Sequence, residues 1–289
     1  MSKIIVSFVI PTINQVSMPV KCLTSLTAGL SLPSRAYEFV VVDDGSPPPL
    51  QKKLEKALRP FGARLLCRHK NSGFARAVNS GAAASRGGYL CLVNNDLVFP
   101  KKDWLGAMLR AMEKPQVGLV GARLLYPGGR LQHAGIIYQP RARRFDHEYR
   151  HRPGNYPPAL GVTEVLGVTG ALMLVEKGLW NKLGGMDEKF FLSWEDVDFS
   201  LRVWAAGRRV IYTGKAFAVH PEGFTRADKK AAARVFWAKK AKESKQWFWR
   251  KWRREFSVSG WPDPGKGAKT GISRLQAAHW LKILKKRRV

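Results

Sequence analysis

The stretch Phe39-Val40-Val41-Val42-Asp43-Asp44-Gly45-Ser46 carries the first evidence of the fold. A continuous apolar run ends there in two carboxylates and a glycine turn. A run that is apolar at every position predicts a strand buried on both faces, as in a parallel sheet covered by helices. Polar side chains that follow such a strand predict a ligand site, because ligands of α/β sheets gather at the carboxyl edge.

The same pattern recurs along the first 225 residues. We expect strands over residues 4–10, 39–42, 64–68 and 89–93, the first of them ended by Pro11, and two more short strands over 210–212 and 216–219. Helices are expected over residues 20–30, 50–58 and 74–84. This alternation predicts an α/β fold of the Rossmann-like type, with a mostly parallel sheet and helices on both faces.

Polar residues follow three of these strands. They are Thr12 after the first, Asp43 and Asp44 after the second, and Asn94 and Asp96 after the fourth. Taken one by one, Asp-Gly-Ser and Asn-Asn-Asp are also good turn sequences. Together they form an acidic edge on a very basic protein, and a divalent cation such as Mg²⁺ or Mn²⁺ explains it, because carboxylates are preferred ligands and the cation bridges to a diphosphate.

A second acidic cluster lies in residues 190–199. Ser193 is placed to cap a helix, with Asp196 at the third helical position, and this arrangement predicts a capping box. Glu195, Asp196 and Asp198 nevertheless crowd three like charges into one turn. An ionised carboxylate beside a bound hydroxyl is also what a general base requires, so both interpretations of Asp196 stay open.

Charge divides the chain in two. The 289 residues hold 50 Lys+Arg against 21 Asp+Glu, a net charge of +29. Residues 226–289 hold 20 Lys+Arg against 4 Asp+Glu, a net +16, while residues 1–225 hold 30 against 17, a net +13. We therefore expect a catalytic α/β domain over residues 1–225 and a basic helical tail over 226–289.

Aromatic side chains are interleaved with the cations of the tail. A breaker-rich linker over residues 260–265 separates them from a last expected helix over 274–289. Exposed rings among cations are typical of an in-plane membrane helix or of a nucleic-acid surface, and the third possibility is that the rings pack against the main domain. The rings are Phe236, Trp237, Trp247, Phe248, Trp249, Trp252 and Phe256.

The cysteines and the apolar segments indicate in which cellular compartment the protein is expected to be found. Three cysteines, two of them inside strand-like runs, predict no disulfide framework and a reducing, cytoplasmic setting. No segment reaches the ~18 apolar residues of a spanning helix. The first residues also lack the pattern of a signal peptide.

Five motifs, in this order and spacing, resemble the family-2 glycosyltransferases of the GT-A fold. Two further stretches, residues 128–135 and 168–171 leading to 184–188, look like the rhamnosyltransferase-like branch of that family. The resemblance covers about residues 4–225. The five motifs are Ser7-Phe8-Val9-Ile10-Pro11-Thr12, Val41-Val42-Asp43-Asp44-Gly45-Ser46, Asn71-Ser72-Gly73-Phe74-Ala75, Asn94-Asn95-Asp96 and Trp194-Glu195-Asp196-Val197-Asp198.

The resemblance implies an inverting transfer of a sugar from a nucleoside-diphosphate donor, UDP-, dTDP- or GDP-linked, to an acceptor hydroxyl. The residues that it assigns to the donor site are Thr12, Asp43, Asp44, Asn71, Gly73, Asn94 and Asn95.

The resemblance also assigns the cation and the base. Asp96 matches the last aspartate of the family's Asp-x-Asp metal motif, whose first position is Asn94 here, so one charged ligand is missing. His220 matches a histidine that joins the metal or diphosphate site, although a lone histidine is equally compatible with a structural role. Asp196 matches the catalytic base, with Glu195 beside it.

Two other functions compete with this interpretation. A nucleic-acid-binding protein would explain the tail but not the acidic edge, so nucleic acid is not expected as a partner. A metal-dependent nucleotidyltransferase would need a glycine-rich first loop with basic residues, whereas residues 11–15 read Pro-Thr-Ile-Asn-Gln. The expected acceptor is a glycan, either lipid-linked or part of a lipopolysaccharide or cell-surface polysaccharide.

The tail predicts where the enzyme acts. Its cations are expected to bring it to an anionic membrane surface, as a peripheral protein on the cytoplasmic face of the inner membrane. The rings would add apolar contact that salt does not screen, so salt should weaken this binding without abolishing it.

Overall fold

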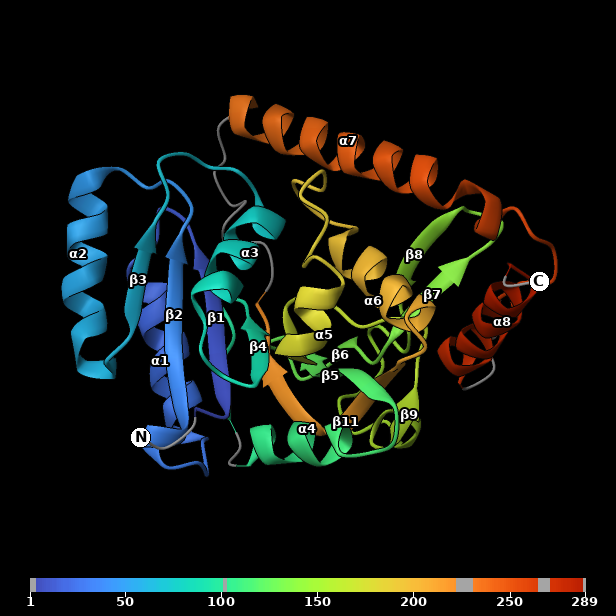
Figure 1. Cartoon of the computed structure of the whole chain (residues 1–289), viewed down its shortest axis with the longest axis horizontal. Coiled ribbons are helices and arrows are strands. Elements are labelled where there is room, and N and C mark those ends of the chain that lie inside the picture. Colours follow the sequence, from blue (N-terminus) through green and yellow to red (C-terminus); the bar gives the residue numbers. More distant parts are fainter. Residues whose placement is uncertain (1–3, 101–102, 222–230, 265–270, 288–289) are drawn as a thin grey trace.

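A nine-stranded sheet runs through the centre of the molecule (Figure 1). The computed structural model describes residues 4–100, 103–221, 231–264 and 271–287. Eight strands follow one another across the sheet, and β6 (Leu131–His133) pairs with β5. The eight, in spatial order, are β3 (Arg64–Cys67), β2 (Tyr37–Asp43), β1 (Val6–Thr12), β4 (Tyr89–Val93), β10 (Leu172–Glu176), β5 (Val117–Leu125), β11 (Arg209–Val219) and β9 (Val162–Glu164).

Most of these strands run in the same direction. β1 is parallel to β2 and β4, and β2 is parallel to β3. β10 is antiparallel to both β4 and β5, so β5 and its parallel partner β11 point the same way as the first four. The predicted mostly parallel sheet is therefore confirmed, and the carboxyl ends of β1, β2 and β4 meet at one edge.

Helices cover both faces of the sheet. In β1, Phe8 and Ile10 belong to one buried core and Val9 to the other, because successive side chains of a strand point to opposite faces. The first core is closed by α1 (Ser17–Ala28), α2 (Pro48–Leu58) and α4 (Trp104–Met112). The second is closed by α3 (Phe74–Ala84), α5 (Lys177–Lys182), α6 (Glu195–Ala205), α7 (Ala231–Phe256) and α8 (Ile272–Arg287).

Two expectations about strands were wrong in detail. Pro11 lies inside β1, where it pairs with Val42, instead of ending the strand. The proline is tolerated because pairing with β4 already stops at Val9, so no ladder bond on that side requires its missing N–H. The two short strands expected around residues 210–219 form one strand, β11, whose register shifts between Thr213 and Phe217.

The C-terminal helices are part of the domain's core. Phe248 is 0% exposed, and Trp252, Phe256 and Trp280 are also buried. Phe256 stacks on Trp261 with ring centroids 4.8 Å apart. The expectation that the rings of the tail are exposed is therefore wrong for Phe248, Trp252 and Phe256, because burying them removes a large apolar area from water.

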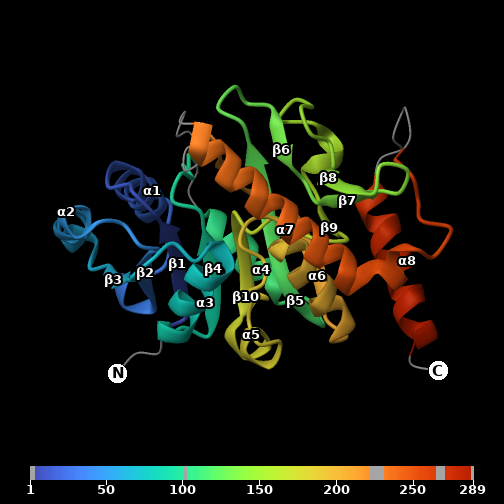
Figure 2. The ribbon, with the colours of Figure 1, turned by 90° about the horizontal axis from the view of Figure 1, so that it is seen from above.

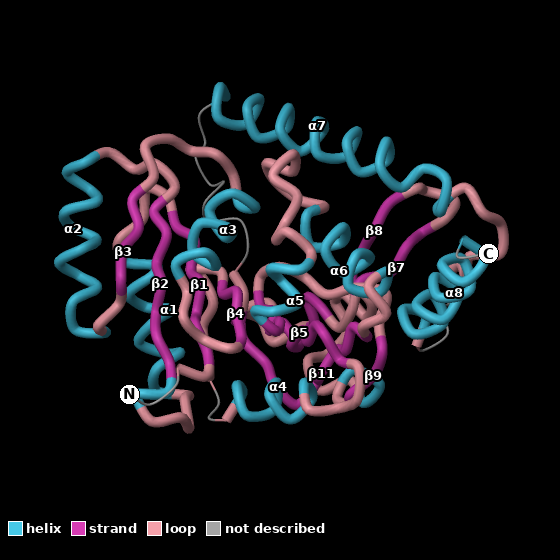
Figure 3. Tube along the Cα trace, in the orientation of Figure 1, coloured by secondary structure: helices cyan, strands magenta, loops and turns pink. Residues whose placement is uncertain are grey.

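Two further features concern the tail and a small hairpin. The expected domain boundary at residues 225/226 lies outside the described residues. Strands β7 (Ile136–Gln139) and β8 (Arg144–His147) form a hairpin of their own beside α7 and α8 (Figure 3). No helix in the described part of the chain is both long and apolar enough to cross a membrane.

Candidate functional site

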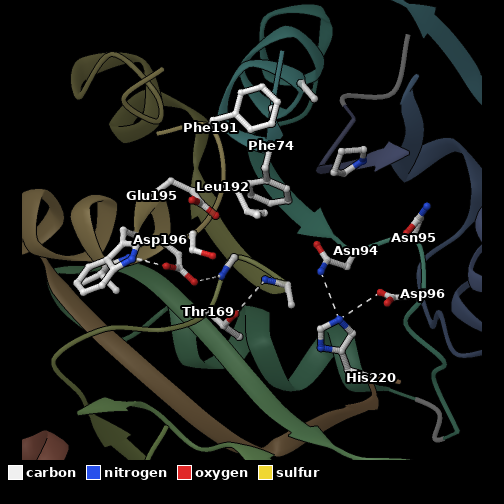
Figure 4. Close-up of a pocket in the computed structure, with 18 of the residues that line it drawn as sticks. Phe74, Asn94, Asn95, Asp96, Thr169, Phe191, Leu192, Glu195, Asp196 and His220 are labelled. Atoms are coloured by element: carbon white, nitrogen blue, oxygen red, sulfur yellow. Dashed lines mark hydrogen bonds and ion pairs between the residues drawn. The ribbon is translucent and has the colours of Figure 1, made fainter. Parts of the chain in front are cut away.

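A cavity of about 460 Å³ opens where the strands end, and Figure 4 shows its lining. Ten of the eleven residues assigned from the sequence to the donor, the cation and the base lie in its wall. They are Thr12, Asp44, Asn71, Gly73, Asn94, Asn95, Asp96, Glu195, Asp196 and His220. The exception is Asp43, which does not line the cavity.

Asp96 and His220 form one corner of the cavity. Oδ1 of Asp96 lies 3.2 Å from Nε2 of His220, and Nδ2 of Asn94 lies 3.3 Å from the same nitrogen. The amide of Gln132 fixes the imidazole, because its Nε2 donates to the carbonyl of His220 (3.2 Å) and its Oε1 therefore faces Nδ1 (2.7 Å). Since Oε1 of Gln132 accepts from Nδ1, the neutral form of this imidazole would have its lone pair on Nε2, toward Asp96.

This corner fits a divalent cation. Oδ1 of Asp96 is buried and accepts no hydrogen bond from the described residues. A buried carboxylate oxygen and an imidazole lone pair that converge are two ligands for Mn²⁺ or Mg²⁺, with the remaining positions left to phosphate oxygens and water. Among the described residues, no cluster of three or more His, Cys, Asp or Glu could hold a metal ion by itself.

Asp44, which follows β2, organises part of the polar wall of the cavity. Its Oδ2 accepts hydrogen bonds from the backbone N–H of Ser72 (3.0 Å) and Gly73 (2.9 Å), and its Oδ1 accepts one from Nε of Arg68 (3.0 Å). Burial raises the pKa of the Asp44 carboxyl above its ordinary value. Gly73 has φ +92°, and a Cβ there would lie 2.4 Å from the carbonyl oxygen of Phe191, so only glycine allows this close approach.

Asp43 has a different position from its neighbour. Its Oδ1 accepts hydrogen bonds from the backbone N–H of Gly45 (3.1 Å) and Ser46 (2.7 Å), and its Oδ2 accepts one from Oγ of Ser46 (2.5 Å). The carboxylate thus closes the turn after β2. Thr12 stays in the cavity wall, where its Oγ1 accepts a hydrogen bond from Nδ2 of Asn95 (2.8 Å).

Asp196 lies across the cavity from the Asp96 corner (Figure 4). Its Oδ2 accepts a hydrogen bond from the backbone N–H of Gly170 (3.0 Å), and its Oδ1 accepts one from that of Val197 (2.8 Å). These two donors hold the carboxylate in place.

The predicted capping box is wrong. α6 begins at Glu195, and the residue before it, Trp194, is left-handed with φ 76° and makes no side-chain cap. Ser193 is also left-handed, with φ 65°. The chain turns sharply here because Trp194 packs against Phe145 and the buried Phe248, so tertiary packing overrides the local capping signal.

Asp198, one of the three carboxylates crowded at the start of α6, is paired with side chains of α6 and α7. Asp198 is 0% exposed, and its Oδ2 accepts a hydrogen bond from Nε of Arg202 (2.8 Å). Its Oδ1 accepts a hydrogen bond from Nε1 of Trp252 (2.8 Å) and forms an ion pair with Nζ of Lys251 (2.7 Å). Both partners on α7 belong to the C-terminal tail, which therefore compensates the charge of Asp198.

Sequence reasoning missed a group of polar residues in the cavity wall. The backbone N–H of Thr169 donates to Nε2 of His133 (3.4 Å), whose Nδ1 lies 2.8 Å from Nδ1 of His147. Burial and the nearby His147 and His220 hold the pKa of His133 well below its usual value, so its ring is neutral. Residues 128–135 and 168–171 were recognised as motifs, but their spacing alone does not reveal this contact.

Sequence reasoning also missed the aromatic part of the wall. Phe74, Phe145, Phe191, Trp194 and Trp237 all line the cavity. Trp237 comes from the tail, and its place in the sequence carries no signal that it returns to the site.

The first comparison is with a curated protein. The chain is 30% identical over 227 residues to the O-antigen biosynthesis protein RfbC of Myxococcus xanthus, an alignment that covers 76% of this chain. It covers only 18% of that relative, so the chain spans about a fifth of the relative's length.

Solved structures share the fold at low sequence identity. The mannosyltransferase PcManGT from Pyrobaculum calidifontis, in complex with GDP-Man and Mn²⁺, matches with a TM-score of 0.62 and 17% identity over 98% of this chain and 70% of its own. GalNAc-T7 with UDP, GalNAc and Mn²⁺ matches with a TM-score of 0.64 and 15% identity over 99% of this chain and 55% of its own. These matches confirm the predicted GT-A fold.

The family follows from a direct match. The model of glycosyl transferase family 2 matches residues 7–161, more than half of the chain. This segment includes the cavity residues at the ends of β1, β2 and β4. The chain belongs to glycosyl transferase family 2, and it has the GT-A fold.

Proposed function

We propose that the protein transfers a hexosyl or deoxyhexosyl group from a nucleoside-diphosphate sugar to an acceptor hydroxyl, with inversion at the anomeric carbon. The observation that carries the proposal is the placement of Asp196 across one cavity from the Asp96 and His220 corner. A displacement that inverts needs its base on one face of the sugar and its leaving group on the other.

The donor site is the polar wall of the cavity. Thr12, Asp44, Asn71, Gly73, Asn94 and Asn95 are the residues that we assign to the nucleoside and the diphosphate. Asp43 supports the turn that presents Asp44. The two structural relatives hold GDP-Man or UDP together with Mn²⁺, which supports a UDP-, dTDP- or GDP-linked donor and a divalent cation, Mn²⁺ or Mg²⁺.

The reaction is a single displacement. The acceptor oxygen attacks the anomeric carbon while the carboxylate of Asp196 takes the hydroxyl proton, and the bond to the diphosphate oxygen breaks. Asp96 and His220 would hold the cation, which supplies electrostatic stabilisation of the charge on the leaving diphosphate. Glu195 adds a second carboxylate at the first position of the same helix.

The acceptor is proposed to be a lipid-linked glycan or another cell-envelope polysaccharide. This assignment is supported by the similarity to an O-antigen biosynthesis protein and by the rhamnosyltransferase-like motifs in residues 128–135 and 168–171. A lipid-linked acceptor requires the enzyme at a membrane surface, and we place it on the cytoplasmic face of the inner membrane. The exposed Lys and Arg of α7 are suited to anionic lipid.

A donor screen tests the proposal. The purified protein is incubated with UDP-, dTDP- and GDP-linked sugars and a mixture of glycan acceptors, with Mn²⁺ or with EDTA, and release of nucleoside diphosphate is measured. We expect release from one donor that depends on the metal and on the acceptor. Release of pyrophosphate from a nucleoside triphosphate, with no release from any nucleotide sugar, would instead support a nucleotidyltransferase.

A further inference from the structure

The two sides of the cavity differ in chemistry. The wall built by the ends of β1, β2 and β4 is polar and contains Thr12, Asp44, Asn94 and Asp96. The wall that leads to Asp196 is aromatic, with side chains from the loop before α6, from β8 and from α7. Phosphate and ribose suit the first wall, whereas the second offers flat apolar surfaces.

Phe191 and Trp237 form the outer part of this aromatic wall. Their ring centroids lie 6.1 Å apart at an interplanar angle of 51°. Phe236 contacts both rings edge-on, at 5.6 Å from Phe191 and 5.2 Å from Trp237, and is itself 40% exposed. Nζ of Lys240 lies 5.2 Å from the centroid of the Phe191 ring. Phe191 and Trp237 thus line the cavity, and Phe236 beside them is partly open to solvent.

Direct bonds hold α7 against the loop that carries Phe191. The backbone N–H of Leu192 donates to Oγ of Ser244 on α7 (3.3 Å). Oδ2 of Asp187 accepts hydrogen bonds from Nε1 of Trp247 (3.0 Å) and Nζ of Lys251 (2.9 Å). Figures 1 and 2 both show α7 lying over α6 at this side of the domain. The two rings are therefore placed by a packed helix and not by a free tail.

A backbone hydrogen bond ties Phe191 to the donor side of the cavity. This bond limits where a ligand that stacks on Phe191 and Trp237 can lie. The backbone N–H of Phe74 donates to the carbonyl of Phe191 (3.1 Å), so the aromatic wall begins beside the donor loop and continues toward Asp196. A ligand that rests on Phe191 and Trp237 consequently lies beside the donor loop, in the same cavity as the carboxylate that we assign as base.

We propose that Trp237 and Phe191 form an acceptor subsite that stacks on the apolar face of a pyranose ring. This inference rests on the proposed glycosyl transfer. A pyranose presents axial C–H groups on one face and hydroxyls on its edge, so it stacks on an aromatic ring while an edge hydroxyl stays free to meet Asp196. The C-terminal tail would thereby determine which acceptors are accepted.

Steady-state transfer by the full chain tests the subsite. Trp237→Ala should raise the acceptor KM about tenfold or more, equivalent to ~1.4 kcal/mol, because one stacking surface is lost. Trp237→Phe should recover most of the affinity. Donor affinity without acceptor, measured by calorimetry, should stay within about twofold of that of the unmodified protein, because the donor wall is unchanged.

The matched control is Val235→Ala on the same helix. Val235 is 68% exposed and does not line the cavity, so Val235→Ala should leave both the acceptor KM and the donor affinity unchanged. If Trp237→Ala leaves the acceptor KM unchanged, the subsite is refuted. If it weakens donor binding as much as acceptor binding, the ring stacks on the nucleobase and the assignment is wrong.

A binding measurement separates this inference from the proposed function. Saturation-transfer NMR with methyl α-D-mannopyranoside, methyl α-D-galactopyranoside and methyl α-L-rhamnopyranoside reports contacts between sugar ring protons and aromatic side chains without turnover. We expect saturation of one of these glycosides by the unmodified protein and its loss in Trp237→Ala. Equal saturation of every glycoside in the two proteins would overturn the subsite even if transfer is observed, and a clear loss would support it even if no donor is turned over.

Discussion

Asp96 is the residue on which the proposed cation site depends most. Its Oδ1 is buried beside Nε2 of His220, and Asn94 supplies no charge at the first position of the motif. Asp96→Asn keeps the shape of the side chain but removes the charge, so we expect a loss of ~10²-fold or more in kcat/KM with Mn²⁺. Titration of the donor by calorimetry, with and without Mn²⁺, should lose its metal dependence.

Asp103→Asn is the control for this variant. Asp103 is an exposed carboxylate that pairs with Arg110 at 2.9 Å on the surface, so its loss should leave turnover unchanged. Near-normal turnover of Asp96→Asn would refute the cation site.

Asp196 is expected to act in the reaction and not merely in the helix. Asp196→Asn should lower transfer by roughly 10²–10⁴-fold while donor affinity stays nearly the same. The side chain also accepts hydrogen bonds from Gly170 and Val197, and an amide keeps only one acceptor oxygen. We therefore expect a stability loss of only ~1 kcal/mol. Turnover and the melting temperature are measured together, and a variant that is less stable but fully active would contradict the role of base.

The part of the site that the sequence could predict is the part that follows strand ends. Thr12, Asp44 and Asp96 meet because parallel strands bring their carboxyl ends to one edge. Gln132 orients His220 from 88 positions away, and its neighbours in the chain give no sign of that contact. Trp237 was expected on an exposed face, since a single sequence does not say which side of a basic helix packs inward.

The ends of helices and strands could be predicted where the local sequence sets them, but not where packing against distant residues does. β4 and α3 were predicted with their observed bounds, because each is an apolar segment closed by polar or glycine residues. The start of α6 could not be predicted, because Ser193 and Trp194 take left-handed conformations under packing from Phe145 and Phe248.

Helix α7 is anchored to α6 through one buried carboxylate. Nζ of Lys251 lies 2.7 Å from Oδ1 of the fully buried Asp198 and donates to Asp187 at 2.9 Å. Lys251→Met keeps the aliphatic chain and removes both interactions, so we expect the free energy of unfolding to fall by about 1–3 kcal/mol. Lys245→Met, an exposed position on the same helix, is the control. Equal stability of the two variants in urea denaturation would contradict the anchoring role.

The whole molecule's stability should depend on pH through Glu148. Glu148 is buried and directly follows β8. Its Oε1 lies 3.4 Å from the backbone N–H of Ser273 in the first turn of α8. Burial outweighs the neighbouring N–H groups and raises the pKa of Glu148 to about 7, against an ordinary value of 4.5. Between these values the folded protein binds a proton that the unfolded chain does not, so stability falls as pH rises through that window and is constant above it.

The variant Glu148→Gln isolates this contribution. Its free energy of unfolding is subtracted from that of the unmodified protein at pH 5, 6, 7 and 8 in urea. We expect the difference to fall by about 1–3 kcal/mol from the lowest to the highest pH. Glu113→Gln, at an exposed glutamate, should give a flat difference. A flat result for Glu148→Gln as well would mean that its carboxyl titrates normally in the folded state.

The last prediction concerns how the molecule meets a membrane. Lys239, Lys242, Arg250 and Arg253 are exposed on one side of α7, opposite the side that buries Phe248 and its neighbours. Each cation near an anionic surface contributes about 1 kcal/mol of attraction, and salt screens it within a Debye length. Because the rings at 248, 252 and 256 are in the core, the apolar contribution expected from them is absent.

We therefore expect the full chain to sediment with anionic vesicles at low salt and to be released at roughly 0.5 M salt, which is a sharper salt dependence than the sequence alone suggested. Changing Lys239, Lys242, Arg250 and Arg253 together to Gln should abolish sedimentation while the melting temperature stays the same, because these side chains are exposed. Neutral phosphatidylcholine vesicles are the control for apolar contact. If the unmodified protein stays in the supernatant at low salt, the membrane proposal is wrong, and the basic face of α7 then meets a soluble anionic acceptor instead.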